Sequence, residues 1–87
     1  MAKRIRHTVT DSKGQVHTRT STSRTYKFAV VHHIAGHHYW GDPTKHWCAP
    51  YSHAEWSGNR ILAERAAAHW RGKQYCEGVE IIEAQVS

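Results

Sequence analysis

The chain has 87 residues and a formal net charge of +5. This length favours one domain, residues 1–87, with a core that is small relative to its surface. Nine aromatic side chains, four of them tryptophan, exclude a disordered tail. No apolar run reaches the roughly 18 residues of a membrane span, and no apolar segment follows the basic residues 1–6. We therefore expect a soluble, cytoplasmic protein with no membrane partner.

The first predicted element is a β-hairpin. Ile5, His7 and Val9 alternate with polar side chains, which is the period of two of a half-buried strand. A second alternating run covers residues 15–21. The segment 10–14 between them has an aspartate early and Gly14 last, where a turn with a bulge needs a residue at positive φ. Residues 4–9 and 15–21 are therefore expected to pair.

A central strand is predicted over residues 25–34, because this segment begins by alternating and then becomes apolar on both faces. Residues 35–46 contain two glycines, a proline and three histidines, a composition typical of a loop. Residues 47–49 form a short predicted strand that Pro50 ends.

The best helix pattern runs from the expected N-cap Ser57 through residues 58–71 to Gly72. Its predicted apolar stripe consists of Leu62, Ala63, Ala66 and Trp70, whose small alanines would let the helix lie close to a sheet. Residues 79–86 are predicted to form the last strand. The order β-β-β-(β)-α-β predicts an α+β fold, a small and mostly antiparallel sheet with one helix packed on one face.

Histidine is the most unusual component of the sequence, with nine residues. Imidazole and thiolate are the natural ligands of zinc, but the paired knuckles of a zinc finger or ribbon are missing here. We therefore predict no metal site and no cofactor. The histidines and the cysteine considered for such a site are His32, His33, His37, His38, His46, Cys48 and His53. With only two cysteines, Cys48 and Cys76, a disulfide framework is not expected.

A second reading of the histidines is a His-Asn-His nuclease, in which His33 would be the general base and His32 or His69 a metal ligand. Asn59 and His69 have a simpler explanation as first-turn and last-turn residues of the helix. No nucleophile elbow or phosphate-binding glycine loop is present. The carboxylates Glu64, Glu80 and Glu83 are expected to lie on the solvent-exposed faces of their helix or strand. The sequence thus predicts a protein that is not an enzyme.

Charge is distributed unevenly along the chain. Residues 1–28 carry seven basic side chains and one acidic side chain, whereas residues 29–87 carry five basic and six acidic ones. A surface that binds polyanions produces such an asymmetry, and so does a solvated basic hairpin without a partner.

Two segments resemble small hypothetical proteins of actinobacteriophages. The first is Thr18-Arg19-Thr20-Ser21 with the strand Arg24-Thr25-Tyr26-Lys27-Phe28-Ala29-Val30-Val31, and the second combines Trp56-Ser57-Gly58-Asn59, Leu62-Ala63-Glu64, Ala66-Ala67 and Val79-Glu80-Ile81-Ile82-Glu83-Ala84. The likeness covers residues 5–34 and 54–84, and the histidine-rich loop departs from it. It implies a phage protein that acts inside a bacterial host, and it implies no catalytic residue.

The leading functional hypothesis is a non-enzymatic phage accessory protein that binds nucleic acid through its basic hairpin. Arginines on strands contact phosphates, and exposed aromatic rings stack on unpaired bases. The expected contacts are Arg4, Arg6, Arg19 and Arg24, with Arg19 sharing the surface of Arg4 and Arg6. The alternatives are a protein that binds and modulates a host protein and, third, the zinc-binding or nuclease-like domain. The sequence leaves the oligomeric state open.

Overall fold

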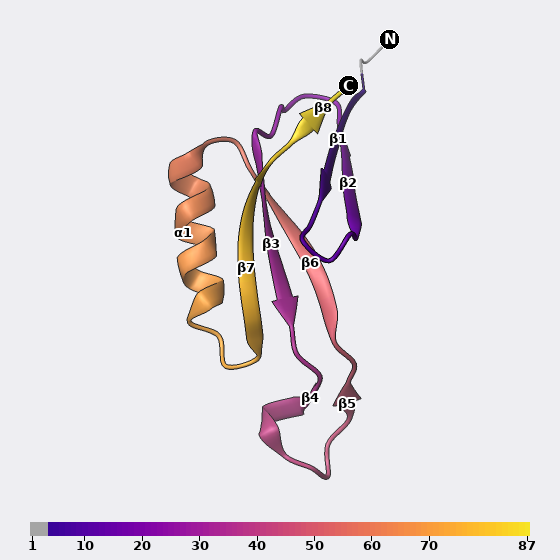
Figure 1. Cartoon of the computed structure of the whole chain (residues 1–87), viewed down its shortest axis with the longest axis vertical. Helices are drawn as coiled ribbons and strands as arrows, with labels where there is room; N and C mark the ends of the chain where they lie inside the picture. Colours follow the sequence, from indigo (N-terminus) through magenta and orange to yellow (C-terminus); the bar gives the residue numbers. More distant parts are fainter. Residues whose placement is uncertain (1–3) are drawn as a thin grey trace.

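The computed structural model describes residues 4–87, and its principal extents are 51 × 26 × 22 Å. Figure 1 shows one helix lying along a sheet, a hairpin on the other side and a narrow arm at one end. The α+β class and the packing of the helix on the sheet are confirmed. The elements are β1 (Ile5–Thr10), β2 (Val16–Ser21), β3 (Phe28–Ile34), β4 (His37–His38), the 3-10 turn η1 (Tyr39–Gly41), β5 (Trp47–Cys48), β6 (Tyr51–Ser57), α1 (Arg60–Arg71), β7 (Cys76–Glu83) and β8 (Gln85–Val86).

β3 is the middle strand of the antiparallel sheet β6-β3-β7, as its apolar character on both faces predicted. One face carries Val30, which is fully buried against the helix residues Ala63 and Ala67. The opposite face carries Ala29 and Val31, which pack with Val9 of the hairpin. The core therefore consists of two thin apolar layers, one on each face of the central strand β3.

The predicted hairpin forms the second sheet, whose order is β2-β1-β8. Gly14 has a φ of 82°, the left-handed conformation that this turn was expected to need. The predicted last strand is divided into β7 and β8 at Ala84, whose N–H donates to the Lys27 carbonyl at 2.8 Å. Because of this break, the end of the chain leaves the central sheet and pairs with β1.

The helix begins later than predicted, and one residue of its predicted apolar stripe lies outside the interface with the sheet. Asn59, and not Ser57, is the N-cap, and its side chain accepts a hydrogen bond from the Leu62 N–H at 2.9 Å. Ser57 is the buried last residue of β6. Leu62 is 48% exposed, whereas Ala63 and Ala67 are fully buried. The expectation that Leu62 packs on the sheet was wrong. The rest of the predicted stripe does face the sheet, since Ala66 packs beside Ala63 and Trp70 stacks on His32 at 3.7 Å.

Strand β6 was missed by the sequence prediction. Its inward-facing side chains include Ser52 and Ala54, so the polar and apolar alternation that normally marks a strand is weak. Residues 35–46, predicted as a loop, contain β4 and η1, and β4 pairs with β5. We call residues 35–50 the finger, since Figure 1 shows this segment extending beyond the ends of β3 and β6. No helical segment in residues 4–87 is long and apolar enough to cross a membrane.

Candidate functional site

The four predicted arginines gather where the hairpin opens, near the loop that joins β2 to β3. Arg6 lies opposite Thr20 in the β1–β2 register, and Ile5 lies opposite Ser21. The Arg24 N–H donates to the Ser21 hydroxyl at 3.0 Å, which brings the loop back to the hairpin. All four side chains are exposed, and within residues 4–87 none of them is paired with a carboxylate. We call this group, Arg4, Arg6, Arg19 and Arg24, the basic end.

Arg19 does not share the face of Arg6, contrary to the sequence prediction. The register pairs Arg19 with His7, whose side chain faces the core and is fully buried. Residues that pair across two strands project on the same side, so Arg19 and Arg6 project on opposite sides of the hairpin. The basic end therefore surrounds the open end of the hairpin and does not form one flat surface.

Buried His7 holds the backbone of Arg19, which belongs to the basic end, and of Tyr26 beside it. Its Nε2 accepts the Tyr26 N–H at 2.9 Å, which leaves the ring proton on Nδ1 to donate to the Arg19 carbonyl at 3.2 Å. The Tyr26 ring meets the His7 ring edge to face at 5.3 Å, and the Arg19 guanidinium lies 4.8 Å from the centre of the Tyr26 ring. Sequence alternation placed His7 inside, but no local pattern could show that it contacts Tyr26.

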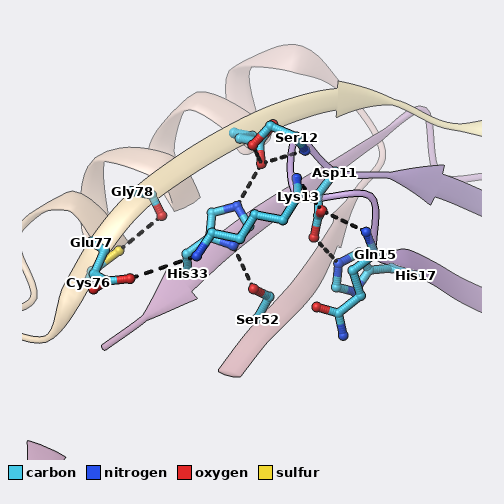
Figure 2. Close-up of polar contacts among 11 residues, drawn as sticks. Asp11, Ser12, Lys13, Gln15, His17, His33, Ser52, Cys76, Glu77 and Gly78 are labelled. Atoms are coloured by element: carbon cyan, nitrogen blue, oxygen red, sulfur yellow. Dashed lines mark hydrogen bonds and ion pairs between the residues drawn. The ribbon is translucent and has the colours of Figure 1, made fainter. Parts of the chain in front are cut away.

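A second polar cluster connects the hairpin turn to the central sheet, and we call it the His33 network: Ser12, His33, Ser52 and Glu80. His33 Nε2 lies 2.6 Å from Glu80 Oε2, and its Nδ1 lies 2.6 Å from the Ser52 hydroxyl. Glu80 also accepts the Ser12 N–H at 3.1 Å and the Ser12 hydroxyl at 2.9 Å. Figure 2 shows the His33 ring between Ser52 on one side and Ser12 of the hairpin turn on the other.

Glu80 is thus not the solvated carboxylate that its sequence position indicated. Burial raises its pKa, but the hydrogen bonds from His33 and Ser12 outweigh burial and hold the pKa below its ordinary value of 4.5. An ionised carboxylate only accepts hydrogen bonds, so His33 Nε2 carries a proton and donates a hydrogen bond to Glu80. In the neutral ring, Nδ1 then accepts from the Ser52 hydroxyl.

The order hydroxyl, imidazole, carboxylate is also that of the triads that perform acyl transfer. In this protein Glu80 binds the hairpin turn through Ser12 as well as His33, so its contacts extend across three segments of the fold. No pocket is found within residues 4–87. The hydrogen bonds of Glu80 to Ser12 and His33 attach the hairpin turn to the central sheet.

Asp11, in the hairpin turn beside this network, makes a similar set of contacts. Its Oδ1 accepts the N–H groups of Lys13 and Gln15 at 2.9 and 3.0 Å, and its Oδ2 lies 2.9 Å from His17 Nε2. Burial raises the pKa of Asp11, but the hydrogen bonds from His17 and the two backbone N–H groups together hold it below the ordinary 3.8. Figure 2 shows this cluster next to the His33 network.

These two lowered pKa values predict a loss of stability in acid. A carboxyl group whose folded pKa lies below its unfolded pKa stabilises the fold fully above the unfolded value, and this contribution disappears as the pH falls through the folded value. The free energy of unfolding should therefore decline below the ordinary values of 4.5 for Glu80 and 3.8 for Asp11. Urea melts over this range would measure it. The double variant Asp11→Asn/Glu80→Gln should show a flatter profile, and an equally steep one would contradict this assignment.

The structure separates the histidines that a nuclease site would need. His32 and His33 project from opposite faces of β3, since His32 stacks on Trp70 of α1 at 3.7 Å. Burial, and then the neighbouring His53, lower the pKa of His32, and its Nδ1 has no hydrogen-bond partner in residues 4–87. Asn59 caps the helix, and His69 is exposed.

Metal ligands do not converge elsewhere in the described range either. No three His, Cys, Asp or Glu side chains of residues 4–87 lie close enough to share an ion. The predicted absence of a metal and a cofactor stays a prediction. Cys48 and Cys76 are both free thiols and half-buried.

The basic end and the His33 network are therefore the two polar arrangements that a function has to explain. The basic end is exposed and unpaired, whereas the network has its hydrogen bonds satisfied within the fold. No family model, curated protein or solved structure matches this chain.

Proposed function

We propose that the protein binds nucleic acid through the basic end. The observation that carries this proposal is the gathering of four exposed arginines at one end of the molecule with no carboxylate paired to them in residues 4–87. Unpaired arginines release counterions when they meet phosphates, and this release supplies most of the affinity of non-specific nucleic-acid binding. Arginines on both faces of the open end of the hairpin suit a polyanion that wraps around that end.

Arg19 is the arginine of the basic end whose side chain and backbone are held by contacts within the fold. Its guanidinium lies over the Tyr26 ring, and buried His7 holds the backbone of both residues. A planar guanidinium that is already oriented loses less side-chain entropy when it forms two parallel hydrogen bonds to a phosphate. Arg19 is therefore the arginine from which we expect the largest single contribution.

The test is the salt dependence of binding. Four phosphate contacts on duplex DNA predict a log-log slope of about −3.6, from about −0.9 per neutralised phosphate. The triple variant Arg4→Ala/Arg6→Ala/Arg19→Ala should reduce the slope to about −0.9, with a large loss of affinity at low salt. Fluorescence anisotropy with a labelled duplex at several salt concentrations measures both quantities.

A matched control is available on the helix. The variant Arg60→Ala/Arg65→Ala/Arg71→Ala removes the same charge from exposed positions of the opposite layer. It should keep a slope near that of the unaltered protein. Equal losses in the two variants would mean that net charge alone attracts DNA, and no binding at about 50 mM salt would reject the proposal.

The biological setting that we propose is the cytoplasm of a phage-infected bacterium, and it rests on the resemblance to actinobacteriophage proteins. The second candidate, a protein that binds and modulates a host protein, is favoured by the exposed tyrosine and tryptophan rings of the finger. Affinity purification from infected cells, with and without nuclease, separates the two. Recovery of host proteins that survives nuclease treatment would favour the second candidate.

A further inference from the structure

The finger exposes aromatic rings that the core does not use. Tyr39, Trp40 and Trp47 are 49%, 85% and 50% exposed. Large aromatic side chains are normally buried to a much greater extent, because each removes a large apolar area from water. Trp40 is the extreme case, and its nearest ring neighbour is Tyr39, at 6.3 Å between ring centres.

The backbone at Trp40 is strained in the conformation that presents this ring. Its φ is 54°, which no other non-glycine residue in the described range shares, and Gly41 follows with a φ of 72°. A left-handed non-glycine residue costs free energy and persists where its surroundings hold it in place. Here the Asp42 N–H donates to the Tyr39 carbonyl at 3.1 Å and closes the turn.

Contacts at the base of the finger fix the position of the segment that carries this turn. The Ala35 N–H donates to the Tyr75 carbonyl at 2.8 Å, and the Tyr75 ring stacks on His37 at 3.8 Å. Trp47 lies directly over Gly36, where an added Cβ would come within 2.5 Å of its ring. Trp47 is therefore an anchor of the finger, whereas Trp40 is a ring held out into solvent.

Beside its rings the finger carries one basic and one acidic side chain, Lys45 and Asp42. Lys45 is exposed, and His46 stacks on Tyr39 with 6.1 Å between ring centres. The one carboxylate of the finger, Asp42, already accepts the Thr44 N–H at 2.9 Å and the Thr44 hydroxyl at 2.7 Å. The hydrogen bonds from Thr44 hold the pKa of Asp42 below its ordinary value of 3.8, so the carboxylate is ionised, and the positive charge of Lys45 offsets it. The rings thus face solvent on a segment without net charge, and a nucleobase has the π-face that stacks on tryptophan.

We infer that the finger stacks on unpaired bases, so that this protein binds single-stranded nucleic acid more tightly than duplex. This inference rests on the proposed function and adds a second contact to it. The molecule is 51 Å long, and the finger and the basic end lie at its two ends (Figure 1). At about 3.4 Å per stacked nucleotide, a strand that touches both ends spans about 15 nucleotides, which is within the range of known single-strand sites.

The test compares Trp40→Ala with Ile61→Ala, a control that removes another exposed apolar side chain from α1, where Ile61 is 66% exposed. The probe is oligodeoxythymidine of about 20 nucleotides, longer than the molecule, beside a duplex of equal length. Trp40→Ala should weaken single-strand binding by about 5- to 150-fold, the effect of one lost base stack. Its duplex affinity and its salt slope should not change, since no charge is removed.

Trp40→Phe provides a further check, because phenylalanine keeps a ring and should restore part of the affinity. Single-strand binding should also quench tryptophan fluorescence in the unaltered protein, and the quenching should be smaller in Trp40→Ala. Thermal melts of both variants should match the unaltered protein, because the Trp40 ring is almost fully exposed.

The outcomes separate this inference from the proposed function. Full single-strand affinity in Trp40→Ala, together with loss of binding in the arginine triple variant, overturns the inference and leaves the proposed function standing. Weakened single-strand binding in Trp40→Ala and unaltered binding in the arginine variant support the finger and reject the basic end. Loss of a co-purified host protein in Trp40→Ala, with single-strand affinity intact, overturns the inference in favour of a protein partner.

Discussion

Replacing Ala67 with leucine should lower the free energy of unfolding by about 1–3 kcal/mol, the usual cost of overfilling a well-packed core. Ala67 is fully buried in one cluster with Ala63 and Val30. Its methyl group is what allows α1 to approach β3 so closely. A leucine there must push the helix away from the sheet or adopt an unfavourable rotamer, and both expose or strain the apolar layer.

The matched comparison is Leu62→Ala on the same helix. Leu62 is 48% exposed, and alanine is the better helix former, so its free energy of unfolding should change by less than about 0.5 kcal/mol. Urea denaturation with both variants measures the difference. A cost of about 2–4 kcal/mol for Leu62→Ala with a neutral Ala67→Leu would mean that Leu62 packs on the sheet, as the sequence pattern predicted.

Replacing Glu80 with alanine should destabilise the protein by about 1–3 kcal/mol, the cost of leaving buried polar groups without hydrogen-bond partners. His33 Nε2 loses the carboxylate that lies 2.6 Å away, and the Ser12 N–H and hydroxyl lose their acceptor. The His33 side chain is only 6% exposed, so little water can replace the contact. The hairpin should also detach more often from the central sheet.

Glu83→Ala is the control, since Glu83 is an exposed carboxylate on the same strand, and it should cost less than about 0.5 kcal/mol. Hydrogen exchange adds a local measurement. The Ser12 amide should exchange faster in Glu80→Ala, whereas amides in α1 should respond only to the global loss of stability. Equal stability of the two variants would mean that the His33 network does not hold the hairpin.

The local patterns of the sequence determined the hairpin, the central strand β3 and the existence of the helix. Each of these depends on neighbours within a few residues. The alternation around His7 and the glycine at position 14 predict the hairpin, and the largely apolar segment from residue 28 to residue 34 predicts β3. The spacing of apolar residues predicts the helix. Such periodicity reports which face of an element is apolar, so the α+β class could be predicted before any contact was known.

Tertiary packing decided which side chains meet. The helix turned its alanines to the sheet and left Leu62 outside, because close approach to Val30 stabilises the interface more than a bulkier contact would. Strand register put Arg19 opposite His7, a relation that a shift of one residue would have reversed. His33 and Glu80 are 47 positions apart in the chain. Their contact, like the exposure of Trp40 at the end of the finger, depends on distant segments that no local pattern describes.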